Sequence, residues 1–112
     1  MTRVLLILLL LGGCDAASNE LPPVEQARSV GAEWAGINQL EAQGRVTHTY
    51  AAMMRRDARS ELETLAGKFA DPRSPEARLV EQLLALPDHA PPAELRQRSA
   101  KLKAIEDRLA VS

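Results

Sequence analysis

The sequence has one cysteine and very few aromatic residues. Because Cys14 is the only cysteine, the chain can form no internal disulfide and offers at most one thiol. Trp34, Tyr50 and Phe69 are its only aromatic residues, so a core must come from Leu, Ala, Val, Ile and Met. Most of these residue types favour helices, and no segment alternates polar and apolar residues as a half-buried strand would. The composition therefore predicts an all-α protein.

The sequence also lacks an excess of charge of one sign and a catalytic motif. It has 14 Lys and Arg against 15 Asp and Glu, so there is no basic excess for binding nucleic acid. No serine stands in a nucleophile-elbow context, and no glycine-rich loop could hold a phosphate. The carboxylate pairs Glu61/Glu63 and Glu106/Asp107 would diverge on a helix. We therefore expect no enzyme, no cofactor and no nucleic-acid partner.

The N-terminus has the order of a secretory signal. Arg3 precedes eight consecutive aliphatic residues, 4–11, and two glycines follow before Cys14. A positive residue, a short apolar run and small residues in this order are typical of a cleaved signal. The apolar run is too short to span a bilayer, which needs about 20 residues. The sequence thus predicts export from the cytoplasm.

The segment Leu11-Gly12-Gly13-Cys14 resembles the lipobox of bacterial lipoproteins. The resemblance implies that the Cys14 thiol receives a diacylglyceryl group, that cleavage falls between Gly13 and Cys14, and that the new amino group is acylated. Several acyl chains on one residue would give a stable membrane anchor. Asp15 resembles the signal that retains such proteins in the inner membrane. We therefore expect a lipid-anchored protein that faces the periplasm, at the inner rather than the outer membrane.

The rest of the chain predicts a short tether and one helical domain. Residues 1–13 form the signal and residues 14–23, which end in two prolines, form the lipid-anchored tether. Residues 24–112 form a bundle of about four helices, a helical hairpin plus two shorter helices. Apolar residues at intervals of three and four predict helices at about 23–43, 47–69, 75–86 and 92–110. The helix starts and stops are indicated by Gly44, Thr47 or Thr49, Ser74 and Pro87.

Two sets of residues suggest binding. His48, Met53 and Met54 carry ligand types that suit Cu(I), but adjacent residues on a helix point about 100° apart. Packing of the methionines is the alternative, so we predict no metal site. His89 lies in a proline-rich loop far along the chain, and nothing in the sequence places it near His48.

The second set is formed by Trp34, Met54, Arg55 and Arg59. Trp34 lies on an apolar stripe and is expected in the core, although a rim position would make it a binding anchor. Arg55 and Arg59 share a helix face that could contact lipid head groups or an acidic partner, or could simply be solvated. The sequence thus favours a non-enzymatic module that binds an envelope protein or its own copies. The alternative is a periplasmic binder of a metal or small ligand through His48, Met53 and Met54.

Overall fold

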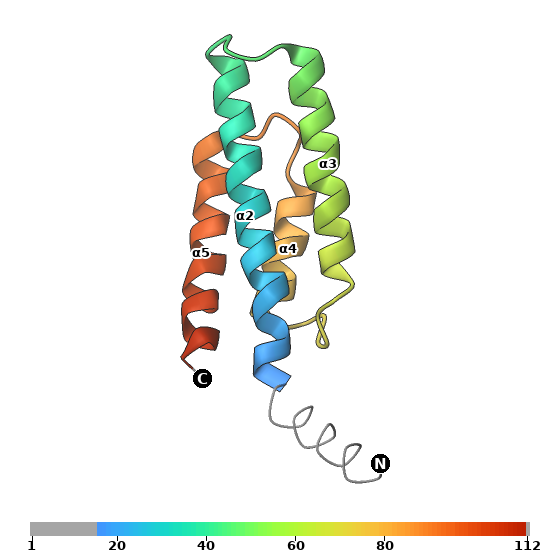
Figure 1. The fold of residues 1–112 in the computed structure, drawn as a ribbon, viewed down its shortest axis with the longest axis vertical. Helices are drawn as coiled ribbons and strands as arrows, with labels where there is room; N and C mark the ends of the chain where they lie inside the picture. The colour runs from blue at the N-terminus through green and yellow to red at the C-terminus, as the bar shows by residue number, and fades with distance from the viewer. Residues whose placement is uncertain (1–15, 112) are drawn as a thin grey trace, which may run out of the picture.

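The computed structural model describes residues 16–111 of the chain, and the side chains of residues 20–111. It contains α2 (Ala16–Ala42), α3 (His48–Ala66), α4 (Pro75–Ala85) and α5 (Pro92–Ala110), and the described residues include no strand. This confirms the predicted small all-α bundle (Figure 1). The predicted signal, cleavage and sorting residues Gly13, Cys14 and Asp15 lie outside the described residues.

The long helix α2 is the centre of the bundle. It packs most extensively against α5 and next against α3, while α4 contacts α3 and α5 (Figure 1). The α2–α3 turn lies at one end of the molecule, and the beginning of α2 and the end of α5 lie at the other. The two ends are therefore separated by the length of α2, about 40 Å for its 27 residues.

Short polar and glycine signals fix the helix ends. Gly44 has a φ of +70°, the left-handed conformation that stops a helix, and the Arg45 N–H donates to the Leu40 carbonyl at 2.9 Å. Thr47 Oγ1 accepts from the Tyr50 N–H at 3.0 Å, so Thr47 rather than Thr49 caps α3. Ser74 caps α4 in the same way through the Ala77 N–H. These positions agree with the sequence-based prediction.

The predicted tether is wrong for residues 16–23, which are helical. Pro22 and Pro23 lie inside α2, although proline removes a backbone hydrogen bond and the two prolines locally predict the end of a tether. Pro23 and Val24 are buried in the bundle, and the Glu20 carboxylate accepts from the Ala70 N–H at 3.3 Å. These tertiary contacts offset the missing backbone bonds. The helix therefore begins two positions after Cys14.

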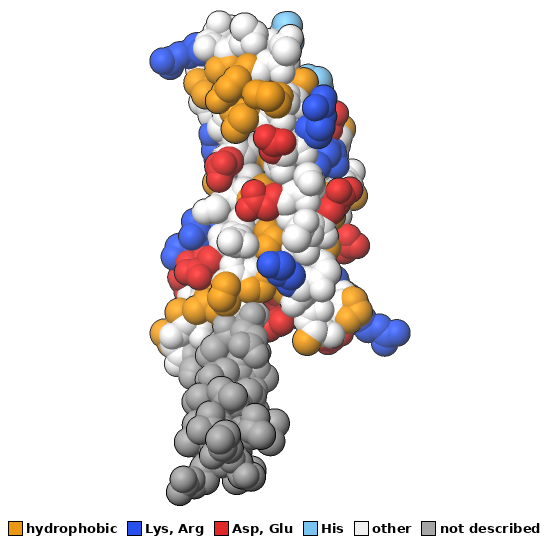
Figure 2. Space-filling model, turned by 45° about the vertical axis from the view of Figure 1, so that its right-hand side comes forward, with side chains coloured by type: hydrophobic (Ala, Val, Ile, Leu, Met, Phe, Trp, Pro, Cys, Tyr) orange, Lys and Arg blue, Asp and Glu red, His pale blue; other side chains and the backbone are white. Residues whose placement is uncertain are grey.

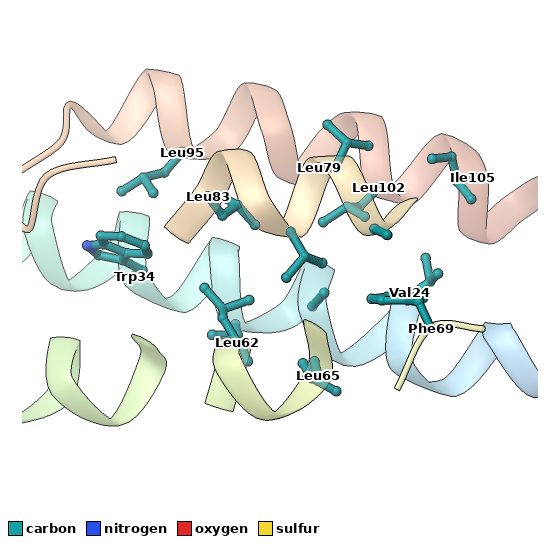
Figure 3. Close-up of a cluster of buried hydrophobic side chains, with 14 of the residues drawn as sticks. Val24, Trp34, Leu62, Leu65, Phe69, Leu79, Leu83, Leu95, Leu102 and Ile105 are labelled. Carbon is teal, nitrogen blue, oxygen red and sulfur yellow. The ribbon is translucent and has the colours of Figure 1, made fainter. Parts of the chain in front are cut away.

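The core is a continuous apolar cluster along the bundle, with Trp34 near one end of it (Figure 3). Tyr50 of α3 lies outside this core and is 44% exposed. The buried stripe of α3 runs through Ala51, the next residue. Because adjacent residues on a helix point about 100° apart, Tyr50 faces away from the core. The largest fully buried side chains are Trp34, Leu62, Leu65, Leu83, Leu95, Leu102, Val24 and Val80.

Gly31 allows α2 and α5 to pack closely. A Cβ at this position would overlap with Ser99 Oγ, which is buried and donates to the Leu95 carbonyl at 3.0 Å. We expect Gly31→Ala to lower the free energy of unfolding by about 1–2 kcal/mol, because overpacking outweighs the gain in helix propensity. Urea unfolding followed by circular dichroism measures this change.

Gly36 provides the matched control for this prediction. It is also inside α2, but a Cβ there would meet nothing within 4 Å. Gly36→Ala should therefore raise the free energy of unfolding by about 0.5–1 kcal/mol. Adding Ser99→Ala to Gly31→Ala should recover most of the loss. Equal effects of the two glycine substitutions would contradict the close approach of α2 and α5.

Candidate functional site

A polar cluster lies next to the α2–α3 turn, where three segments meet. Arg55 of α3 is at its centre and is 5% exposed. Its Nη1 donates to Asn38 Oδ1 at 3.1 Å and to Glu41 Oε1 at 2.7 Å, both from α2. Its Nη2 lies 3.1 Å from Nε2 of His89, in the α4–α5 loop. One buried guanidinium thus joins α3 to α2 and to a distant loop.

Glu41 connects this cluster to both histidines of the chain. Its side chain is 7% exposed, and Oε2 lies 2.7 Å from Nδ1 of His48. Its Oε1 lies 3.5 Å from Nε2 of His89. The hydrogen bond from Arg55, and after it that from His48, lowers the pKa of Glu41 to about 2 from an ordinary value of 4.5. Glu41 is therefore a carboxylate at neutral pH.

The lowered pKa of Glu41 predicts how stability depends on pH. A carboxyl group with a depressed folded-state pKa stabilises the fold fully above its unfolded-state pKa of about 4.5. This contribution is lost as the pH falls from about 4.5 towards 2. We expect wild type to be more stable than Glu41→Gln at pH 6, and the difference to shrink progressively below pH 4.5. Urea unfolding at pH 6, 4 and 2.5 measures it.

Glu81→Gln is the control for this pH series, since Glu81 is exposed on α4. It should leave the stability difference between pH 6 and pH 2.5 close to that of wild type. A difference between wild type and Glu41→Gln that stayed constant down to pH 2.5 would contradict the ionised contact with Arg55.

A second set of contacts holds the α4–α5 loop against the hairpin. Trp34 Nε1 donates to the Asp88 carbonyl at 2.9 Å, and Asn38 Nδ2 donates to the Asp88 and Ala90 carbonyls at 3.0 and 2.9 Å. Arg59 Nε donates to Asp88 Oδ1 at 2.7 Å. Its Nη atoms donate to the Leu84 and Leu86 carbonyls at the end of α4. The loop backbone is thereby bound at several points.

Arg59 also covers the tryptophan. Its guanidinium carbon lies 4.8 Å from the centroid of the Trp34 ring, a cation–π distance. The Trp34 side chain is 1% exposed, so the expected core position is confirmed. The indole N–H needs a hydrogen-bond partner in this buried position, and it finds one in the Asp88 carbonyl of the α4–α5 loop.

These positions correct the predicted binding surface. Trp34 and Arg55 are buried, so neither side chain can be an exposed anchor of a docking surface in this fold. Arg59 is partly exposed, but its donors are engaged by Asp88 and by α4. The expected solvated face of α3 is wrong at Arg55 because the α4–α5 loop folds over it. The spacing of residues along one helix cannot predict a contact with a loop this far away in the sequence.

The structure does not support His48 and the methionine pair as one site. His48 faces Glu41 at the turn and its side chain is 91% exposed, whereas Met54 lines a groove between α2 and α3. Within residues 16–111, no group of three or more His, Cys, Asp or Glu could hold a metal ion. The approach of His89 to Glu41 was missed, since the two are far apart in sequence.

Two hollows flank the polar cluster. One of about 410 Å³ is lined by Glu41, His48 and His89, together with Asn38, Ala42, Ala90 and Pro92. The other, about 350 Å³, is lined mainly by the arginines of α3, Asp88 and His89. Both volumes lie in the range of small-ligand pockets. However, the charged groups beside these hollows are already paired within the protein. Arg55 binds Glu41 and Arg59 binds Asp88, so the geometry favours a role in shaping this end of the bundle.

An exposed apolar surface lies at the same end of the molecule. Tyr50 and Met53 of α3 are 44% and 47% exposed, and neighbouring exposed apolar side chains can mark an interaction site. Figure 2 shows hydrophobic side chains gathered close to the α2–α3 turn, with acidic side chains next to them. We call this surface the hairpin face; it consists of Tyr50, Met53 and Met54, which share one face of α3, and of Ile37 of α2, which lines the same groove as Met54.

Comparisons of the chain with protein-family models, with curated proteins and with solved structures found no match. None of the helices among residues 16–111 has the length and apolar character needed to cross a membrane.

Proposed function

We propose that this protein is a lipid-anchored accessory module of the bacterial cell envelope that binds another envelope protein and catalyses no reaction. The observation that carries the proposal is the hairpin face, which exposes Tyr50 and Met53 at the end of the bundle opposite the start of α2. The hairpin face lies about 40 Å from the start of α2, the length of a 27-residue helix, and Cys14 precedes that start by two positions in the sequence.

Two features of the fold suit a binding role. The polar cluster around Arg55 and Glu41 fixes the α2–α3 turn and the neighbouring loop, so the hairpin face is rigid before a partner arrives. A preformed surface loses less conformational entropy on binding than a flexible one. An anchor at Cys14 would also confine the protein to the membrane and raise its effective concentration near a partner there.

The anchor is tested by mass spectrometry of the full chain recovered from cells. We expect the wild-type protein to begin at Cys14, to carry the mass of a diacylglyceryl group and an acyl chain, and to fractionate with membranes. Cys14→Ser should retain residues 1–13 and carry no lipid. A wild-type protein with an unmodified Cys14 would overturn the anchor.

The location within the envelope follows from Asp15. We expect the wild-type protein to sediment with inner-membrane markers on a density gradient, and Asp15→Ser to move towards outer-membrane fractions. Recovery of the wild type with outer-membrane markers would contradict inner-membrane retention while leaving the anchor itself intact.

Binding is tested by purification of the tagged full chain from solubilised membranes. We expect the wild type to recover an envelope protein in near-stoichiometric amount and Tyr50→Asp or Met53→Asp to lose it. Gln97→Asp, an exposed position on α5, is the control and should retain it. Absence of any stoichiometric protein in the wild-type sample would contradict the proposed function.

A further inference from the structure

A shallow acidic groove continues from the hairpin face along the seam between α2 and α3. It has a volume of about 50 Å³ and is lined by Val30, Glu33, Trp34, Ile37, Met54, Asp57, Ala58 and Glu61. Glu33, Asp57 and Glu61 are exposed. Tyr50, Met54, Asp57 and Glu61 follow one another at helical spacing on a single face of α3. The apolar face and the acidic groove are therefore one continuous surface.

The carboxylates of this groove have no partner within the described residues. Glu33, Asp57 and Glu61 make no hydrogen bond or ion pair there, whereas Glu41, Asp88 and Glu106 each bind an arginine. The arginines of α3 lie on its other side, where Arg55 and Arg59 face the α4–α5 loop. The helix thus separates its charges, with negative charge gathered beside exposed methionine and tyrosine.

We propose that the hairpin face and the acidic groove together bind a basic amphipathic helix of the partner protein. Apolar side chains of that helix would pack on Tyr50, Met53 and Met54, and its Lys and Arg would pair with the groove carboxylates. A seam between two helices suits a third helix, and methionine adapts readily to different apolar side chains. This inference rests on the proposed function and names the chemistry of its partner.

Charge and size favour this occupant over three others. A second copy docked by the same face would place carboxylates against carboxylates across the two-fold axis. Anionic lipid would be repelled for the same reason. A drug-sized molecule needs a pocket of about 300 Å³ or more, far above the 50 Å³ of this groove.

The test uses a fluorescent 18-residue helical peptide of leucine and lysine, with lysine on one face. It is titrated with the full chain in nonionic detergent, and fluorescence anisotropy reports binding. We expect saturable binding that weakens as salt is added, because exposed charges are screened. A peptide of the same pattern with glutamate in place of lysine should bind at least tenfold more weakly.

Matched variants locate the binding surface. Asp57→Lys lies in the groove and Glu63→Lys makes the same charge change at an exposed position elsewhere on α3. We expect Asp57→Lys and Met53→Asp to weaken binding at least tenfold and Glu63→Lys to change it less than twofold. Circular dichroism and thermal unfolding confirm that each variant is folded. Tyr50→Ser serves in place of any variant that fails to fold.

Other results would overturn the inference. Absence of binding, equal weakening by Glu63→Lys, or equal affinity for the glutamate peptide would each show that this surface does not select a basic helix. The lysine peptide could show no binding while the purification from membranes still recovers a partner whose binding depends on Tyr50. In that case the proposed function stands and the inferred chemistry of the partner is wrong. If no partner is recovered either, both fail.

Discussion

Trp34→Ala is expected to lower the free energy of unfolding by about 3–5 kcal/mol, the largest effect of any single substitution in the bundle. The ring is 1% exposed and sits among the largest core side chains, so its removal leaves a cavity that cannot collapse fully. The substitution also removes the donor to the Asp88 carbonyl and the ring beneath Arg59. A domain of this size has a total free energy of unfolding of about 5–15 kcal/mol, so the Trp34→Ala variant would be close to unfolding.

Urea and thermal unfolding measure this loss, and the melting temperature should fall by about 15 °C or more. Trp34→Phe retains much of the apolar volume but lacks the indole N–H, so it should lower the free energy of unfolding less than Trp34→Ala. The lost hydrogen bond should account for about 1–2 kcal/mol, in addition to the effect of the smaller ring. Equal stability of Trp34→Ala and the wild type would contradict the buried position of Trp34.

Arg55→Met is expected to lower the free energy of unfolding by roughly 3 kcal/mol. Methionine replaces the apolar stem of the arginine but supplies no donor, so Asn38 Oδ1 and Glu41 Oε1 each lose the hydrogen bond from Arg55, while Glu41 Oε2 keeps its contact with His48. The cost therefore comes mainly from polar atoms left buried without a hydrogen bond. The contact between α3 and the α4–α5 loop through His89 is lost as well.

Arg56→Met is the matched control, since Arg56 is adjacent and exposed. It should change stability by no more than about 0.5 kcal/mol. Combining Arg55→Met with Glu41→Gln should cost clearly less than the sum of the two single effects, because the two side chains share one interaction. Additive effects in this double-mutant cycle, measured by urea unfolding, would contradict the Arg55–Glu41 contact.

The elements that sequence analysis predicted well are those whose signals are local. The caps Thr47 and Ser74, the left-handed Gly44 and the prolines before α4 and α5 act within one turn of the residues they order. The start and end of α5 therefore match the prediction, and α3 and α4 differ from it only at their ends. Helix periodicity likewise placed Trp34 in the core.

The elements that were missed depend on contacts between distant parts of the chain. Pro22 and Pro23 read locally as helix breakers, but burial of Pro23 and Val24 holds them in α2. The local sequence predicts Arg55 at the surface, because nothing in α3 indicates that His89 and Asp88 lie over this face of the helix. The contacts around the polar cluster likewise join residues that are 50 or more positions apart, such as Asn38 and Asp88.

The two ends of the bundle thus have different roles in the proposed function. The start of α2 follows Cys14 by two positions, so a lipid there would hold the helix close to the membrane. The Arg55–Glu41 cluster stabilises the opposite end, where the hairpin face exposes Tyr50 and Met53. Substitutions in the cluster should therefore weaken binding through loss of shape, and substitutions in the face should weaken it without loss of stability.

Site-specific photo-crosslinking in cells tests this account most directly. A photoreactive amino acid replaces Met53 on the hairpin face or Gln97 on α5, in the full chain with Cys14 intact or with Cys14→Ser. We expect one discrete crosslinked envelope protein from position 53, none from position 97, and a strong loss of the crosslink when Cys14 is replaced. The same crosslink from both positions, or one from position 53 that does not depend on Cys14, would contradict it.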